Sequence, residues 1–297
     1  MATSLSAPPA AVLSPRARRA AERSGTERPN WGLTALIIVA SLAVLLPLYF
    51  TVAMALKTSE EAGTGTGFSW PWPMQFENFA DAWTLTNFPR AFGISLGITV
   101  ATVAGLVTLA SSAAYAIARN WDRKFFRWSY FYLLAAMFIP FPVIALPQIK
   151  LVSIVNLDNP FGVAILHILF GLSFNVLLYT AFLRSIPYEL EESARLDGAS
   201  TWQVFWRLVF PLLAPMNATV GIFAFLASWN DFMMPSLITS DPAMQTIPVV
   251  QSIFQSQFSS NYNVAFASYL MALAPTVVAY IFAQRWVMTG VTRGAIK

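Results

Sequence analysis

The sequence predicts an all-α integral membrane protein with six transmembrane helices and a further helical segment between the fourth and fifth spans. Hydrophobic residues make up 57% of the 297 positions, charged residues only 11%, and the mean hydropathy is +0.58. In a soluble domain roughly a quarter of the residues are charged. Six apolar stretches are long enough to cross roughly 30 Å of hydrocarbon, and basic residues gather on one side of them.

The six predicted spans follow these apolar stretches, and the polar loop 185–208 separates the fourth from the fifth. Their approximate ranges are 31–56, 91–118, 128–155, 161–183, 209–237 and 264–284. In the second span, Gly93 and Gly97 are small residues one turn apart, and Gly105 extends a face that lets helices approach closely. The third span contains three prolines, which remove backbone donors and predict a kink or a break: Pro140, Pro142 and Pro147.

The basic residues predict the orientation of the spans. With the N-terminus in the cytoplasm, fifteen of the 18 lysines and arginines lie inside, and only Lys57, Arg90 and Lys150 lie outside. This distribution satisfies the positive-inside rule, and the opposite orientation violates it at every loop. We therefore expect both chain ends and the loop 185–208 in the cytoplasm. The net charge of +4 is explained by this topology rather than by binding to nucleic acid.

Both ends of the chain differ in composition from the spans. Residues 1–30 are rich in Ala, Pro, Ser and Arg without apolar periodicity, which predicts a disordered basic cytoplasmic arm; we assign it no function. Residues 287–297 form a cytoplasmic C-terminal tail that also lacks apolar periodicity and contains Gly290 and Gly294. We expect that this tail does not fold by itself.

Several kinds of chemistry are excluded by composition. There is no cysteine and only one histidine, His167, so disulfides, thiolate metal sites, cysteine nucleophiles and a lipid anchor on cysteine are absent, and a zinc site cannot be built from histidines. No G-x-x-x-x-G-K-[ST] sequence occurs. We expect no catalytic residue, metal or cofactor, and therefore not an enzyme.

The sequence of the loop 185–208 predicts two helices joined by a turn at a glycine, which we call the corner. Three glutamates follow Pro187 and suit the first turn of a helix that starts near Ser185: Glu189, Glu191 and Glu192. The helix is expected to stop at Gly198, after which Ser200 and Gln203 form a capping-box pattern. The second helix carries an apolar stripe that needs a partner surface, formed by Trp202, Phe205, Trp206 and Val209.

This segment resembles the EAA motif of ABC importer permeases in both order and spacing. The matching residues are Glu192, Ser193, Ala194, Asp197, Gly198 and Ala199, followed by Leu208, Phe210 and Pro211. Ser193 stands where the motif has alanine, and Leu208 and Phe210 stand for its isoleucine and leucine. The resemblance implies a coupling helix that docks into a cleft of a cytoplasmic ATPase subunit.

Two later segments resemble the maltose-type carbohydrate importer permeases. Residues 229–232 read W-N-D-F, and 284–297 resemble the family ending, with Val291 and Ile296 in place of leucine and valine and without the final glycine. Residues 156–161 match the family only loosely. The resemblance implies that four residues of the tail contact the ATPase subunits: Arg293, Gly294, Ala295 and Lys297. Anionic lipid is the alternative partner for this tail.

A few polar residues occur within the predicted spans. Asn175, Asn217, Asn230 and Asp231 are candidates either for the solute path or for structural hydrogen bonds. For Asp231 we favour the structural role, because we expect it near the outer end of the fifth span, where water reaches it. For His167 we favour a hydrogen bond between helices over a proton relay.

The resemblance implies a permease subunit in a bacterial or archaeal inner membrane that translocates a sugar or oligosaccharide. The implied partners are a second homologous permease, two ATPase subunits and an extracytoplasmic sugar-binding protein that meets the outer loop 238–263. An importer of glycerol phosphate diesters or another polar solute is the alternative of the same architecture. An ion-coupled secondary transporter needs buried titratable groups and inverted repeats, and a membrane glycosyltransferase needs a separate acid cluster; neither is seen in the sequence.

Overall fold

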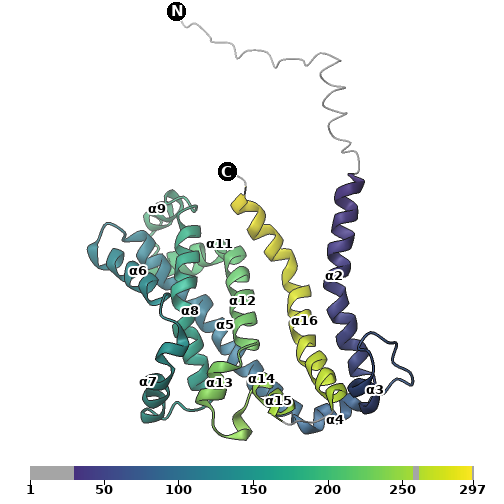
Figure 1. Ribbon diagram of the computed structural model, residues 1–297. Coiled ribbons are helices and arrows are strands. Elements are labelled where there is room, and N and C mark those ends of the chain that lie inside the picture. The colour runs from purple at the N-terminus through teal and green to yellow at the C-terminus, as the bar shows by residue number, and fades with distance from the viewer. Residues whose placement is uncertain (1–29, 257–260, 296–297) are drawn as a thin grey trace, which may run out of the picture. The chain divides into compact units, whose positions relative to one another are not determined.

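The computed structural model describes residues 30–256 and 261–295, and every regular element in these ranges is a helix (Figure 1). The chain divides into two compact units, residues 1–50 and 51–297. The first unit contains most of α2 (Trp31–Ala55), whose 25 residues have a hydropathy of 2.5 and are long enough to cross a membrane. This helix agrees with the predicted first span.

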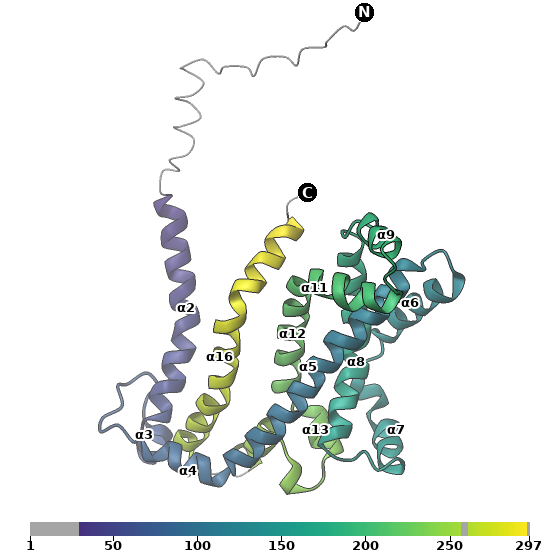
Figure 2. The same cartoon turned by 180° about the vertical axis from the view of Figure 1, so that it is seen from behind.

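The second unit is built around four helices: α5 (Phe88–Arg119), α8 (Pro160–Leu183), α12 (Ala214–Trp229) and α16 (Tyr262–Ala295). α5 packs along α8 and α12, and α12 packs along α16. Figure 2 shows α5 running from α4 (Glu77–Leu85) at one end of this unit to α6 (Lys124–Ala136) at the other. The main core cluster joins α5, α8 and the segment 204–224 through buried side chains that include Tyr179, Leu183, Val209 and Leu213.

The contact between α5 and α8 depends on small residues. A Cβ added at Gly105 would lie 2.3 Å from Cδ1 of Ile168, and one added at Gly171 would lie 2.7 Å from Cδ1 of Leu106. The expected packing role is therefore confirmed for Gly105. It is wrong for Gly93 and Gly97 within this chain, because a Cβ at either position meets nothing within 4 Å.

The predicted third span is not one continuous helix. It consists of α6 and α7 (Phe141–Ile154), which are bent by 103° across the break at 137–140. Pro140 precedes α7 and Pro142 lies in its first turn. A proline disfavours helical backbone in the residue before it and has no N–H to donate, so the prolines explain why the helix stops and restarts in another direction.

The predicted fifth span, 209–237, is also divided. Residues 201–212 comprise α10 (Thr201–Gln203), a π-helical turn (Val204–Val209) and α11 (Phe210–Leu212), and this segment is bent by 75° from α12. α12 has only 16 residues, and a separate helix, α13 (Met233–Ile238), follows the non-helical residues 230–232. Among the described residues, four helices are long and apolar enough to cross a membrane, or six if each bent pair counts as one span.

The last helix is longer than predicted. α16 is helical to Ala295, so the described backbone of the tail 287–297 continues the last helix and does not form a separate element. The physical reason is that the tail extends an existing helix, and adding residues to a helix avoids the unfavourable nucleation step. Residues 296 and 297 lie outside the described residues.

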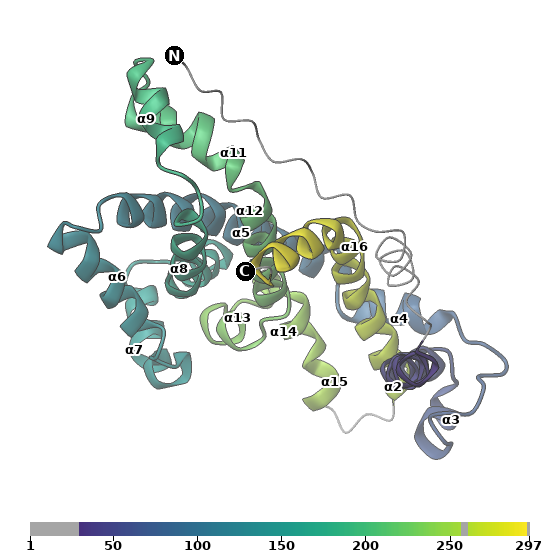
Figure 3. The same ribbon diagram turned by 90° about the horizontal axis from the view of Figure 1, so that it is seen from above.

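The short helices of the second unit lie at its two ends. α9 (Glu189–Leu196) and α11 lie at one end, and α4, α13 and α14 (Ile247–Gln251) lie at the other (Figure 1). Seen from above, α11 lies between α9 and α12 (Figure 3). The remaining short helices are α3 (Ser59–Thr64), a 3-10 turn (Pro242–Met244) and α15 (Ile253–Ser256).

Candidate functional site

The predicted corner between two helices is present at residues 189–203. α9 begins at Glu189 rather than near Ser185, because Ser185 and Ile186 still bond to the end of α8 through N–H contacts to the carbonyl oxygens of Phe182 and Leu183. The three glutamates therefore occupy the first turn of α9, where unpaired amides and the positive end of the helix dipole favour carboxylates.

Gly198 forms the corner as predicted, with a φ of +86°. The N–H of Gly198 bonds to the carbonyl oxygen of Arg195 at 3.0 Å, and that of Ala199 bonds to the oxygen of Ala194, also at 3.0 Å. These are the two hydrogen bonds of a Schellman motif. A Cβ at Gly198 would meet nothing within 4 Å, so glycine is favoured here for its backbone conformation and not for lack of space.

The helix after the corner begins with the predicted capping box. The Gln203 N–H donates to Oγ of Ser200 at 3.3 Å, and the Ser200 N–H donates to Oε1 of Gln203 at 2.8 Å. Its apolar stripe is largely covered by the chain itself, since Phe205 and Val209 are buried and the Phe205 ring lies 5.1 Å from that of Tyr115 on α5. The stripe therefore finds most of its partner surface within the chain; of its four residues only Trp202 is strongly exposed, at 69%.

A cavity of about 530 Å³ lies between α9 and the helix after the corner. Its lining includes most residues of the predicted motif, namely Ser193, Ala194, Asp197, Gly198, Ala199 and Leu208, together with Leu190, Gln203, Val204 and Arg207. The other three motif residues are not part of its lining: Glu192 and Pro211 are exposed, and the Phe210 ring packs 4.9 Å from that of Trp206. The tertiary structure thus gathers six of the nine motif residues around one concave surface.

Glu191 anchors this corner to α5, and the sequence analysis did not identify that role. Its side chain is fully buried, accepts a hydrogen bond from the Tyr115 hydroxyl at 2.7 Å, and forms an ion pair with Nε of Arg119 at 2.7 Å. Arg195 lies one turn along α9, with Nη2 at 3.6 Å from the carboxylate. The sequence contains one indication of this contact: Tyr115 and Arg119 are four residues apart and therefore lie on one face of a helix.

Two arginines also hold the linker between α8 and α9. The Arg119 guanidinium lies 5.6 Å from the ring centroid of Tyr188 and donates to the carbonyl oxygen of Ile186 at 3.4 Å. Arg184 lies 4.8 Å from the ring centroid of Trp121, just beyond the end of α5. Cation–π contacts of this kind add to the ion pair, so the segment between α8 and α9 is attached to the end of α5 by several contacts.

The polar residues of the spans occupy different environments. Asn217 accepts a hydrogen bond from the Tyr179 hydroxyl at 2.8 Å, and this bond joins α12 to α8. Asn230 is exposed and donates to the carbonyl oxygen of Leu226 in the preceding helix. His167 of α8 contacts Oγ of Ser228 on α12 through Nδ1 at 3.0 Å, and Oδ2 of Asp231 through Nε2 at 2.8 Å. The contact with Ser228 is the expected hydrogen bond of His167 between helices.

Asn175 has a polar atom without a partner. Its Nδ2 donates to the carbonyl oxygen of Gly171 at 2.8 Å, whereas its buried Oδ1 has no hydrogen-bond partner. Asn175 and Asp231 line one cavity, together with His167. Within the described part of the chain, no group of three or more His, Cys, Asp or Glu residues is placed to hold a metal ion.

The predicted contact residues at the C-terminus are only partly within the structure. Arg293, Gly294 and Ala295 belong to the last turns of α16, and Lys297 lies outside the described residues.

The fold and the corner together define a multi-pass membrane protein with a polar two-helix element at one end. Comparison with known families gives a match over residues 106–293 to the model for the binding-protein-dependent transport system inner membrane component. The chain belongs to this family.

Two curated relatives are similar over most of the chain. The multiple sugar-binding transport system permease protein MsmG of Streptococcus mutans serotype c is 32% identical, with 88% of this chain and 95% of the relative covered. The probable starch degradation products transport system permease protein AmyC of Thermoanaerobacterium thermosulfurigenes is also 32% identical, with 89% and 96% covered. The chain therefore spans nearly the full length of both relatives.

A solved structure shares the fold. It is a bacterial ABC transporter involved in the import of the acidic polysaccharide alginate, with a TM-score of 0.73 and 20% identity over 86% of this chain and 96% of the matched chain. This likeness concerns the arrangement of the helices.

Proposed function

We propose that this protein is a permease subunit of an ATP-binding-cassette importer that translocates a sugar or oligosaccharide. The observation that carries the proposal is the α9 corner, which gathers the EAA-like residues around one cavity in a chain of the binding-protein-dependent permease family. The names of the two relatives, one described by multiple sugars and one by starch degradation products, support a saccharide as the solute.

The corner is proposed to receive the ATPase subunit. The cavity between α9 and the following helix presents the carboxylate of Asp197 and the guanidinium of Arg207, and Trp202 stays exposed beside it. When the ATPase subunits close, the push on α9 passes through the buried Glu191 to Arg119 and so to α5. Because α5 packs on α8 and α12, this movement of α5 tilts the three helices together.

The remaining partners follow from the same architecture. A second homologous permease completes the solute path, two ATPase subunits supply the energy, and a binding protein delivers the solute at the outer end. With α9 in the cytoplasm of the cell and six spans in the inner membrane, both termini are cytoplasmic, and the segment 239–256 at the opposite end of the second unit faces outward. Arg293, Gly294, Ala295 and Lys297 are proposed to contact the ATPase pair.

Reconstitution in liposomes tests the proposal. The complete transporter, assembled with its own ATPase, second permease and binding protein, is expected to import maltose or raffinose only when ATP is supplied on the cytoplasmic side. This polypeptide by itself is expected to hydrolyse no ATP and to transport neither sugar. Uptake by the chain alone along an ion gradient would identify a secondary transporter instead, and ATP-driven uptake of a glycerol phosphodiester but of no sugar would identify the alternative importer.

A further inference from the structure

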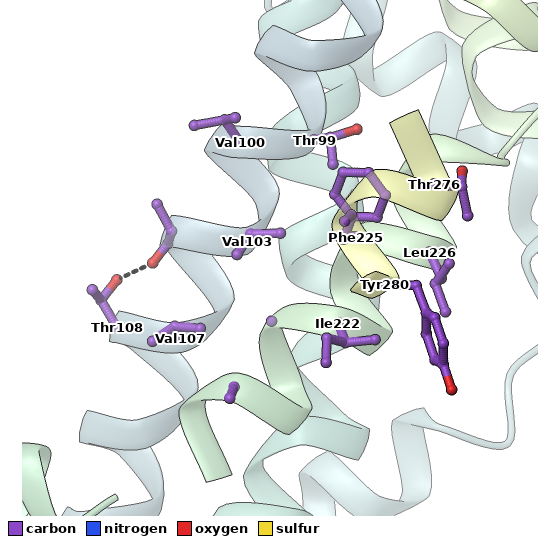
Figure 4. Close-up of a pocket in the computed structure, with 14 residues that line it drawn as sticks. Thr99, Val100, Val103, Val107, Thr108, Ile222, Phe225, Leu226, Thr276 and Tyr280 are labelled. Carbon is purple, nitrogen blue, oxygen red and sulfur yellow. Dashed lines mark hydrogen bonds between the residues drawn. The ribbon is translucent and has the colours of Figure 1, made fainter. Parts of the chain in front are cut away.

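Two cavities of similar size lie on different faces of the α5–α12 pair, and their chemistry differs. The first, of about 520 Å³, is bounded by α5, α12 and α16 and is lined by side chains such as Val103, Ile222 and Phe225 (Figure 4). None of its lining residues is Asp, Glu, His, Lys or Arg. Its Thr108 hydroxyl donates to the carbonyl oxygen of Ala104 on its own helix, so this surface suits acyl chains or another apolar helix.

The second cavity, of about 510 Å³, is bounded by α5, α8 and α12 and contains polar and aromatic groups together. Its polar lining consists of Thr102, His167, Asn175, Ser228 and Asp231, and its rings are those of Phe170, Phe174 and Phe223. A concave, mainly apolar site of a few hundred cubic ångströms with a few converging polar groups is typical of small-molecule binding.

One end of this cavity lies near the start of α8 and the end of α12. His167 is the eighth of the 24 residues of α8, which places it about 10 Å along the helix axis from the start of α8. Asp231 contacts His167 at 2.8 Å, and it is the second residue after α12, which ends at Trp229.

An acidic side chain and an interrupted helix at this end of the cavity indicate contact with water. The Asp231 side chain is 24% exposed, and a carboxylate facing hydrocarbon is costly. Residues 230–232 are not helical, and within a membrane such backbone is tolerated where it is buried in protein or lines a water-filled cavity. Both features favour the Asp231 cavity over the apolar one as the surface that faces a polar path.

Two lining residues have hydrogen-bonding capacity that the protein leaves unused. Oγ1 of Thr102 and Oδ1 of Asn175 are buried without a hydrogen-bond partner, an arrangement that costs free energy unless another group supplies a donor. Asp231 is also an acceptor, with Oδ1 receiving the Met233 N–H and Oδ2 contacting His167. A ligand that suits this site is rich in donors and carries no negative charge.

Building on the proposed function, we infer that the cavity of α5, α8 and α12 is a solute-contacting wall of the path and accepts a neutral, hydroxyl-rich sugar unit. Hydroxyl groups of the sugar donate to Asp231, Asn175 and Thr102, while its C–H faces pack on Phe174 and Phe223, whose rings lie 6.5 Å apart. The carboxylate of Asp231 disfavours a phosphodiester or an acidic saccharide by like-charge repulsion.

Cysteine accessibility tests this inference, because the chain has no cysteine of its own. Ala227 and Ala104 are both exposed alanines, and they line the polar and the apolar cavity respectively. Ala227→Cys and Ala104→Cys are introduced singly into the complete reconstituted transporter and treated during ATP turnover with a small, charged, water-soluble thiol reagent. Modification is followed by mass spectrometry, which does not depend on transport.

We expect Ala227→Cys to react at least tenfold faster than Ala104→Cys. We also expect saturating maltose or raffinose, whichever sugar the wild-type complex imports, to slow the reaction of Ala227→Cys and a glycerol phosphodiester to leave it unchanged. Equal reactivity of the two cysteines, absence of protection by the imported sugar, or protection by the phosphodiester instead would each overturn the inference. A wild-type complex that imports no sugar contradicts the proposed function separately, before either cysteine is compared.

Discussion

At the scale of single residues, Glu191 connects the α9 corner to α5, one of the helices long and apolar enough to cross a membrane. It is the fully buried member of three glutamates in the first turn of α9, and its carboxylate contacts Tyr115 and Arg119 of α5 within 2.7 Å. Breaking a buried ion pair by removing one partner is more costly than the pair's net contribution, because the other charge stays buried. Arg119, with only 13% of its side chain exposed, is the charge that would remain.

Glu191→Gln is therefore expected to destabilise the attachment of α9 by about 3 kcal/mol. The measurement is the thermal unfolding of the purified complex in detergent, combined with the ratio of sugar imported to ATP hydrolysed. Both the unfolding midpoint and this ratio are expected to fall. Glu192→Gln is the control for the midpoint, because Glu192 is exposed in the same turn and surface changes usually stay within about 0.5 kcal/mol. Identical midpoints for the two variants would refute the anchoring role.

Substitutions of Gly198 test the corner itself. Its φ of +86° costs a residue with a Cβ about 1 to 2 kcal/mol, while the open space around it removes steric collision as an explanation. Gly198→Val is expected to lower the import-to-hydrolysis ratio most, Gly198→Ala less, and Gly198→Asn least, because asparagine tolerates this conformation. Membrane insertion should stay normal. The corner model fails if Gly198→Val imports as well as the wild type.

At the scale of elements, the close contact of α5 with α8 connects the α9 corner to the central helices, and the coupling proposal depends on it. Gly105 and Gly171 allow this approach, since a Cβ at either meets a side chain of the other helix at less than 3 Å. By contrast, α6 with α7 and α11 with α12 are bent by 103° and 75°. The unbroken α5 is accordingly the element best suited to transmit a rigid movement.

Leucine substitutions at two glycines of α5 test whether the helix depends on close packing against α8 at Gly105 or only on having glycine in its sequence. Gly105→Leu is expected to destabilise the subunit by about 1 to 3 kcal/mol through overpacking against Ile168. Gly97→Leu makes the same chemical change on the same helix, where nothing lies within 4 Å of an added Cβ, and is expected not to destabilise the isolated subunit. Thermal unfolding in detergent measures both. A larger loss for Gly97→Leu would mean that α5 packs on α8 through a different face.

At the scale of the whole molecule, the orientation in the membrane is open to a direct test. Leu196 at the end of α9 is 89% exposed, and Ala243 is exposed in the 3-10 turn at the opposite end of the second unit. In intact cells, a membrane-impermeant thiol reagent is expected to label Ala243→Cys, and to label Leu196→Cys only after the membrane is permeabilised. The reverse pattern would invert the topology on which the coupling proposal depends.

Much of the architecture was predictable because it depends on local sequence. Apolar length located the helical stretches, the glycine and capping-box pattern predicted the corner at Gly198 and Ser200, and both are present. The prolines predicted an interruption of the third span, but not its angle. The early end of α12 was not predicted, because 209–237 is almost continuously apolar and apolar length does not show where a helix changes direction.

The sequence by itself determined the membrane setting, the helical class and the EAA-like segment, because hydrophobicity, helix capping and turn conformation are properties of residues close together in the chain. Only the tertiary structure decided that Glu191, of three neighbouring glutamates, is buried against Arg119, and that Asp231 meets His167 inside the helical group. These pairs are 72 and 64 residues apart. Their proximity depends on how α5, α8 and α12 pack against one another, and this packing cannot be inferred from residues that are close together in the chain.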